Sequence, residues 1–259
     1  MTFTYFPGCT LRTTGVRLDQ CGRKTAQALG FTLVEPDDWQ CCGAVYPMAR
    51  DEIATRLSSV RALMAARERG EPLVALCSAC YHVIKRVNLD MQRDEEIRDK
   101  VNRSLKPEVP YCGETKVLHY LEVLRDVVGF EELKKHVVSP LTGRKIGAYY
   151  GCMLLRPSRE LGLDDPENPT ILEDLLRALG AQPVVYAMRN ECCGGYATVD
   201  RPDYAAAQAK KVLENAAACG AEELVTACPL CLYNLRGAMP VTYFTELLTQ
   251  ALGLEVEGK

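Results

Sequence analysis

The chain has 259 residues, of which 47% are hydrophobic and 25% charged, an ordinary composition for a soluble globular protein of one or two domains. Its 31 lysines and arginines are scattered and are outnumbered by 34 aspartates and glutamates, so the formal charge of −3 argues against a nucleic-acid partner. The apolar runs are far shorter than the roughly 20 residues of a membrane-spanning helix, and the first residues show no export signal. We therefore expect a cytoplasmic protein without a direct membrane span.

Short strands alternate with helices along the chain, which indicates parallel α/β units. One helix is expected around Ile53, Leu57, Val60 and Met64, whose spacings of 4, 3 and 4 residues make an amphipathic stripe. The charged residues 92–106 show no such stripe and predict a solvated helix extension, followed by a loop at 106–110. The expected strands are 3–6, 31–34 and 73–76 in the first half and 145–150, 183–186 and 224–226 in the second, and helix-like segments at 119–124 and 243–248 end the two halves.

The 13 cysteines reveal an internal repeat. Each half contains a single Cys, then a Cys-Cys-Gly triplet, then a Cys-x-x-Cys motif, and 34 residues separate the triplet's second Cys from the last motif in both halves. Chance does not account for this agreement, so we interpret the chain as a duplicated unit. The first set is Cys9, Cys41, Cys42, Cys77 and Cys80, and the second set is Cys152, Cys192, Cys193, Cys228 and Cys231.

The repeat defines the expected architecture. We predict an α/β fold of two pseudo-repeated CCG units, each a small parallel sheet flanked by helices, with domains at 1–139 and 140–259. The Pro- and Gly-containing turn at 138–143 is the expected junction. The cysteine motifs follow predicted strands, and open α/β sheets bind ligands at the carboxyl ends of their strands. The five thiols of each unit are therefore expected to converge at one end of one sheet.

Five thiols per unit narrow the chemistry. Four thiolates already saturate a zinc ion, and adjacent cysteines seldom both reach one ion. Soft thiolates favour iron–sulfur clusters, in which neighbouring thiolates can reach different irons. Glycines such as Gly43, Gly194 and Gly195 allow backbone amides to approach the sulfurs. Cys21, Cys112 and Cys219 fall outside the repeat, and we expect them to be structural core residues.

The duplicated arrangement C-x31-CCG-x33-CxxC and C-x39-CCG-x33-CxxC resembles the two CCG domains of the B-type subunits of heterodisulfide reductases over nearly the whole chain. The resemblance implies two noncubane [4Fe-4S] clusters, one held by each set of five cysteines. It also implies an iron–sulfur catalytic subunit that reduces a disulfide, or oxidises dithiols in reverse, by single-electron steps. A disulfide placed between two clusters would have an iron available for each sulfur, which avoids a free thiyl radical. Implied partners are a ferredoxin-like subunit with cubane clusters and a flavin-containing subunit.

No side chain is assigned as the catalytic acid or base. His82 and His119 are weak candidates for proton delivery, against the alternative that each is structural. Two other functions stay open at this point. One is an electron-relay CCG subunit of a lactate- or glycolate-oxidising complex, and the other is a zinc or structural scaffold, which predicts a colourless protein.

Overall fold

Two parallel four-stranded sheets form the framework of the protein, in a computed structural model that describes residues 1–44 and 51–256. The strand orders are β2-β1-β3-β4 and β6-β5-β7-β8, so the second sheet repeats the topology of the first. Helices flank both sheets, and the predicted α/β fold with two pseudo-repeated units is confirmed. We call the elements from β1 to α7 the first unit and those from β5 to α12 the second unit.

The first unit begins with β1 (Thr2–Phe6), α1 (Gly8–Arg12), α2 (Val16–Ala28), β2 (Thr32–Val34), α3 (Ala54–Arg69) and β3 (Leu73–Ala75). It continues with α4 (Ser78–Arg93), α5 (Glu95–Leu105), β4 (Val117–His119), α6 (Tyr120–Glu122), the π-helical turn η2 (Val123–Val128) and α7 (Phe130–Lys135).

The second unit begins with β5 (Lys145–Tyr149), α8 (Ser158–Leu161), α9 (Ile171–Ala178), β6 (Gln182–Val184) and the 3-10 turns η3 (Ala187–Asn190) and η4 (Gly195–Ala197). It continues with α10 (Pro202–Ala218), β7 (Glu223–Thr226), α11 (Pro229–Asn234), β8 (Val241–Tyr243) and α12 (Phe244–Ala251).

Two short strands were not predicted. β4 pairs in parallel with β3, and β8 pairs in parallel with β7, immediately before the helices expected at 119–124 and 243–248. Three residues are too few to show a strand periodicity, and pairing with a distant neighbour makes them strands. His119 and Tyr243 then serve as helix N-caps in capping boxes that Glu122 and Glu246 complete, so the helices begin one residue later than expected.

The prediction for residues 92–106 was wrong in two respects. Residues 95–105 form a separate helix, α5, because Asp94 has an extended backbone and its carboxylate accepts a hydrogen bond from the Ile97 amide. Val101 is fully buried, and Ile97 and Leu105 pack against the core, so one face of α5 is not solvated. The apolar stripe of α5 consists of only three residues, and it cannot be recognised in the sequence among so many charged residues.

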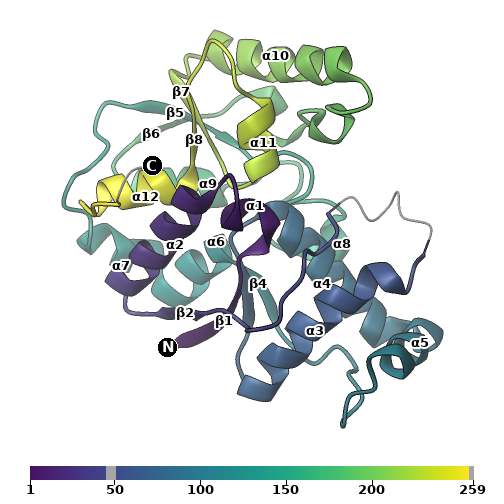
Figure 1. Ribbon diagram of the computed structural model, residues 1–259. Helices are drawn as coiled ribbons and strands as arrows, with labels where there is room; N and C mark the ends of the chain where they lie inside the picture. Colours follow the sequence, from purple (N-terminus) through teal and green to yellow (C-terminus); the bar gives the residue numbers. More distant parts are fainter. Residues whose placement is uncertain (45–50, 257–259) are drawn as a thin grey trace.

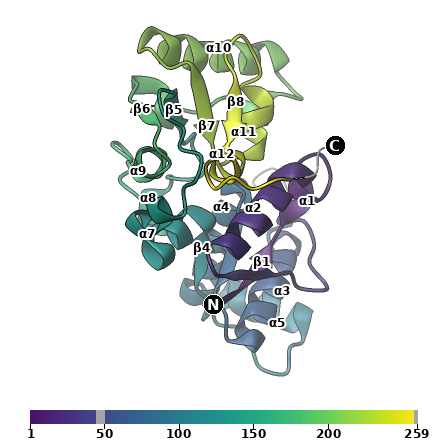
Figure 2. The same ribbon diagram turned by 90° about the vertical axis from the view of Figure 1, so that its left-hand side faces the viewer.

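The two units exchange their last helices. α12 of the second unit packs on α2 of the first, and α7 of the first unit packs on α9 of the second. Figures 1 and 2 show α12 lying alongside α2, far from its own α10. Phe244 contacts the rings of Tyr120 and His119, and Thr245 donates a hydrogen bond to the Leu18 carbonyl at 3.0 Å. One continuous core therefore spans both units, and the domain boundary between residues 139 and 140 stays a prediction.

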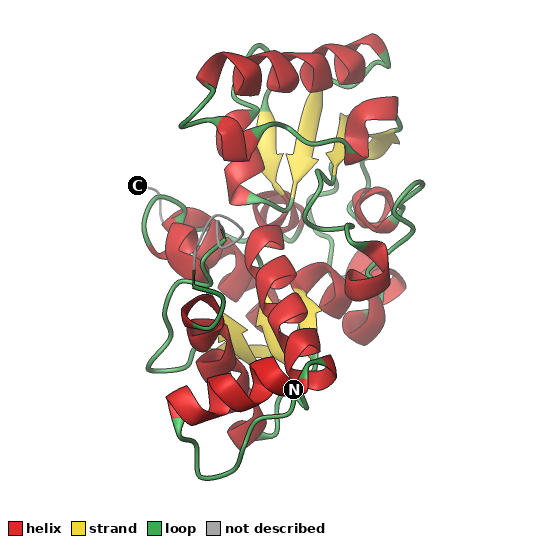
Figure 3. Ribbon diagram, turned by 90° about the vertical axis from the view of Figure 1, so that its right-hand side faces the viewer, coloured by secondary structure: helices red, strands yellow, loops and turns green. Residues whose placement is uncertain are grey.

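The carboxyl ends of both sheets face each other across the middle of the molecule, as the arrowheads in Figure 3 show. The chain leaves β3 and β7 at this level and enters the two Cys-x-x-Cys motifs. The exchange of helices fixes the two sheet ends opposite one another, and this is where the candidate site lies.

Candidate metal centre

All ten repeated cysteines lie after the carboxyl ends of strands. Cys9 follows β1, the Cys41-Cys42 pair follows β2, and Cys77 and Cys80 follow β3 at the start of α4. The second unit repeats this placement, with Cys152 after β5, Cys192 and Cys193 after β6 and η3, and Cys228 and Cys231 after β7. None of the 13 cysteines forms a disulfide, so every thiol of the two sets is free.

The sulfur atoms meet in pairs. In the first set, Cys41 Sγ lies 3.5 Å from Cys9 Sγ and Cys42 Sγ lies 3.3 Å from Cys80 Sγ. In the second set, Cys193 Sγ lies 3.6 Å from Cys231 Sγ. Within residues 1–44 and 51–256, however, no group of three or more His, Cys, Asp or Glu side chains closes around a position for a metal ion. The geometry thus consists of linked sulfur pairs and does not show a mononuclear tetrahedral site.

Glycine backbone approaches the sulfurs closely in both units. The Gly43 amide donates to Cys41 Sγ at 3.5 Å, and the Gly194 amide donates to Cys192 Sγ at 3.3 Å. Both glycines have positive φ angles, 69° and 81°, a backbone conformation that L side chains rarely adopt. At Gly8, also at positive φ, a Cβ would lie 2.7 Å from Cys80 Sγ. These glycines leave room around the sulfurs and supply amide dipoles that stabilise thiolates.

The thiol pairs share protons unequally. Hydrogen bonds from Cys41 and Cys80 lower the pKa of Cys42 to about 4, and a hydrogen bond from Cys152 lowers the pKa of Cys192 to about 6. The same hydrogen bonds raise the pKa of the partners Cys41 and Cys152. Each pair therefore favours one thiolate beside one thiol. Thiolate is the form that binds a metal, so a soft metal centre would displace the remaining protons.

The two sets adjoin one another. Interaction with the Cys228 side chain is the largest cause of the lowered pKa of Cys77, which places the two thiols close to each other. The Ser78 amide and hydroxyl donate to the Ala227 carbonyl at 3.1 and 2.8 Å. The buried Tyr243 hydroxyl lies 2.8 Å from the Leu76 carbonyl and 3.2 Å from the Ala227 carbonyl. The residues that precede Cys77 and Cys228 are thus tied together across the unit boundary.

Tyr196 is a site residue that the sequence did not reveal. It extends from the second CCG loop, and its hydroxyl donates to the Ala44 carbonyl of the first CCG loop and contacts Met153 Sδ at 3.2 Å. A pocket at the second set is lined by Tyr196 and Ser78 together with the cysteines of that set. Burial and nearby cysteines of both units raise the pKa of Tyr196. The internal repeat identifies only residues that both units share, and the residue that matches Tyr196 in the first unit is a valine, Val45.

The two histidines occupy different environments. His119 is fully buried, its Nε2 donates to the Leu76 carbonyl at 2.9 Å, and its Nδ1 accepts from the Leu121 amide. Burial lowers its pKa to about 3, so the neutral ring is held in place and the structural alternative is favoured. His82 is half-buried, and its Nδ1 lies 3.2 Å from the Met153 carbonyl, which follows Cys152. His82 therefore links the first Cys-x-x-Cys helix to the second unit.

The three cysteines outside the repeat do not all fit the expectation of core residues. Cys21 is buried in α2, as predicted. Cys219 is exposed because it is the C-cap of α10, where the helix ends before Gly220, and Cys112 is exposed in the loop before β4. The expectation was wrong for Cys112 and Cys219, since a helical sequence pattern does not reveal the last residue of a helix.

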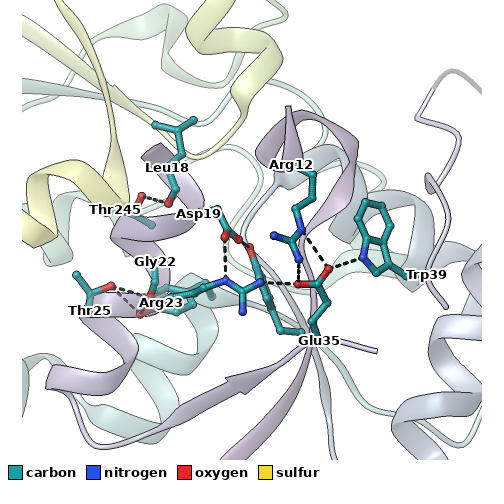
Figure 4. Close-up of polar contacts among 11 residues, drawn as sticks. Arg12, Leu18, Asp19, Gly22, Arg23, Thr25, Glu35, Trp39 and Thr245 are labelled. Carbon is teal, nitrogen blue, oxygen red and sulfur yellow. Dashed lines mark hydrogen bonds and ion pairs between the residues drawn. The ribbon is translucent and has the colours of Figure 1, made fainter. Parts of the chain in front are cut away.

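A polar network joins the segments that lead to the first CCG loop (Figure 4). Glu35, which follows β2, accepts hydrogen bonds from Arg12, Arg23 and the Trp39 indole. Arg23 also donates to Asp19, which accepts from the Tyr5 hydroxyl at 2.7 Å. Arg12 closely follows Cys9 and Trp39 closely precedes Cys41. The network therefore holds the segment next to each of these two cysteines in place.

Among the described residues, no helix is long and apolar enough to cross a membrane.

A curated relative in Wolinella succinogenes, the 8-methylmenaquinol:fumarate reductase membrane anchor subunit, is 33% identical over 97% of this chain and 92% of that protein. The B-type subunit of the ferredoxin/F(420)H(2)-dependent CoB-CoM heterodisulfide reductase of Methanosarcina acetivorans is 29% identical over 96% of this chain and 88% of that protein.

The fold also has a relative among solved structures. The crystal structure of a hypothetical protein from Helicobacter pylori superposes with a TM-score of 0.75 over 98% of this chain and 49% of that one, at 11% identity, which shows a shared fold alone. The model of the CCG cysteine-rich domain family matches residues 3–85 and 146–236, one region in each unit. Together with several relatives that are named for the same B-type subunit of heterodisulfide reductase, these matches identify the chain as a member of the CCG family with two cysteine-rich domains.

Proposed function

We propose that the protein is the iron–sulfur subunit of a heterodisulfide reductase-like complex and that it carries two noncubane [4Fe-4S] clusters. The relatives support an iron–sulfur electron-transfer role and oxidoreductase activity. In this proposal, each set of five cysteines holds one cluster. The observation that carries the proposal is the duplication of a five-thiol set whose members lie beside one another at facing sheet ends.

The donor set fits a polynuclear cluster better than a single ion. Sulfur atoms pair at 3.3–3.6 Å in both sets, and each CCG loop carries two adjacent cysteines. Such thiols can reach several irons more readily than they can share one zinc ion. The amides of Gly43 and Gly194 already point at sulfur. When bound, such clusters would supply electrons one at a time, which a disulfide accepts in two steps.

The chain's own residues would position the disulfide. The pocket at the second cysteine set is lined by Ser78 of the first unit and by Tyr196 of the second, so the substrate would bind beside the second set where the two units meet. Tyr196 would hold the two CCG loops at a fixed separation through its contact with Ala44. We assign no catalytic acid or base, and His82 remains a candidate for proton delivery beside Cys80. Further parts of the proposal are a cytoplasmic location and ferredoxin-like and flavin-containing partners.

The Wolinella relative favours a second candidate function. A chain 33% identical to a subunit of a quinol:fumarate reductase could serve the same role without touching a disulfide. The two cysteine sets would then only relay electrons within a larger oxidoreductase. The two candidates share the clusters and differ in whether the isolated subunit reduces a disulfide.

The first test is metal content. Anaerobically purified protein should be brown and contain about eight irons and eight acid-labile sulfides per chain. Cys42→Ser and Cys193→Ser should each remove about half of both, whereas the matched control Cys219→Ala, at an exposed position, should remove none. Zinc without sulfide would refute the cluster proposal.

The second test separates the two candidates. The iron-loaded chain, reduced with a one-electron dye, should slowly turn over an added disulfide, with thiols as the product. Full cluster content without any disulfide turnover would favour the relay function.

A further inference from the structure

An open groove lies on the outer side of the second unit, between α10 and the end of α11 with the chain that follows it. Its floor is apolar, with Ala205, Ala209 and Leu213 contributed by α10. Tyr233 and Arg236 line the opposite side. Figures 1 and 2 show α10 at the extreme end of the molecule, with the two sheets on one side of it.

The internal repeat shows what kind of element such a groove holds. In the first unit, α3 and α4 occupy the positions of α10 and α11, one before the third strand and one within the Cys-x-x-Cys motif. α5 packs against both of them and buries Val101 between Ile97 and Leu105. In the second unit, only residues 235–240 connect α11 to β8, so the connection is too short for a matching helix. The groove thus lies on the side of the second unit where the first unit has an amphipathic helix of its own.

The charged residues of the groove indicate which kind of helix would bind there. Lys210 and Glu214 form an ion pair with each other at 3.6 Å. The Arg236 guanidinium lies 5.1 Å from the centre of the Tyr233 ring, and no carboxylate in residues 1–44 and 51–256 forms an ion pair with it. A helix with an acidic residue beside its apolar stripe would therefore satisfy both the apolar floor and Arg236.

The groove also adjoins the second cysteine set. Asn234, which lines the groove, donates from Nδ2 to the Cys193 carbonyl at 2.5 Å. Thr198, another lining residue, donates to the Gly195 carbonyl at 2.7 Å and lies 3.2 Å from Asn234 Oδ1. A helix seated in the groove would thus be separated from the second CCG loop by a single layer of hydrogen-bonded side chains.

We propose that this groove is the docking site for an acidic amphipathic helix of the subunit that delivers electrons to the second cysteine set. The identity of that subunit as an electron donor rests on the proposed function, whereas the docking of a helix rests on the repeat and on Arg236. A second copy of this chain is the competing occupant.

Site-specific crosslinking tests the occupant. The full-length chain carries p-benzoylphenylalanine in place of Tyr233, is expressed in its native host and is irradiated under anaerobic conditions. The expected product is a crosslink to a different subunit of the isolated complex, at a peptide with apolar residues every three or four positions and a nearby Asp or Glu. The control places the same photoreactive residue at Val109, which is similarly exposed in the first unit. Crosslinks from position 233 to a second copy of the chain, or none while the complex is recovered intact, would overturn the proposal.

A charge reversal tests the electrostatic part independently. Arg236→Glu should reduce the amount of partner retained on the purified chain about tenfold, the effect of one important interface residue. Arg103→Glu, on the exposed side of α5, is the matched control and should retain the partner. Iron content, sulfide content and dye-driven turnover should stay unchanged in both variants. If Arg236→Glu binds the partner normally, the docking site is wrong although the clusters are present. If the wild-type chain contains no iron, the proposed function fails first.

Discussion

At the scale of single residues, Tyr196 breaks the symmetry of the repeat. The ten cysteines are matched between the units, yet Tyr196 belongs to one unit and contacts the CCG loop of the other. In the proposed function, a pseudo-symmetric pair of clusters would give a disulfide two equivalent orientations, whereas a tyrosine contributed by one unit alone would make the two orientations different. Tyr196 would thereby favour one orientation of the substrate.

Tyr196→Phe tests this role because it keeps the ring and removes the hydroxyl. We expect unchanged iron and sulfide content and a three- to tenfold loss of disulfide turnover, about the size expected for one lost hydrogen bond. The measurement is kcat and KM with a one-electron dye, and the effect should fall mainly on KM if the residue positions the substrate pocket. Tyr204→Phe, exposed on α10 and lining neither the pocket nor the groove, is the control. A loss of iron in Tyr196→Phe would mean that the residue supports a cluster instead.

At the scale of elements, local signals explain what the sequence predicts. Six strands and ten cysteine positions follow from short apolar runs and fixed spacings, which neighbouring residues determine. β4 and β8 have only three residues each and exist because β3 and β7 lie beside them. The burial of one face of α5 and the contact between Tyr196 and Ala44 likewise join residues far apart in the sequence. A single sequence carries no readable signal for such contacts, so these features could not be predicted.

The loop after β2 should depend on pH through Glu35. Burial raises the pKa of this carboxyl, but hydrogen bonds from Arg12 and Trp39 outweigh burial and leave the pKa below its ordinary value. A carboxyl whose pKa is lowered by folding stabilises the folded state above its unfolded pKa of about 4.5, and this contribution is lost as the pH falls through the lower, folded pKa. The urea midpoint should therefore fall as the pH is lowered from about 4.5 through the folded pKa of Glu35, and by less in Glu35→Gln. An equal fall in both proteins would show that Glu35 does not contribute.

At the scale of the whole molecule, the exchange of α7 and α12 joins two units that the sequence divides cleanly. A linker at 138–143 and two matches of the family model describe two domains. The hydrophobic core is continuous across that boundary, since Phe244 of the second unit is fully buried against Tyr120 of the first. The exchange also explains why both cysteine sets can lie close together, because it leaves the facing sheet ends no freedom to separate.

This coupling predicts how fragments behave. Residues 1–139 expressed alone would expose the face of α2 that α12 covers, and residues 140–259 would expose the face of α9 that α7 covers. Burying a side chain such as Phe244 contributes about 3–5 kcal/mol, a large share of the roughly 5–15 kcal/mol that stabilises a typical domain. We expect each fragment alone to be aggregated or unfolded by circular dichroism and gel filtration. Co-expressed, the two fragments should form a stable 1:1 complex. Fragments that fold separately and do not bind each other would show that the boundary at 139/140 separates two independent domains and that the exchanged helices are dispensable for stability.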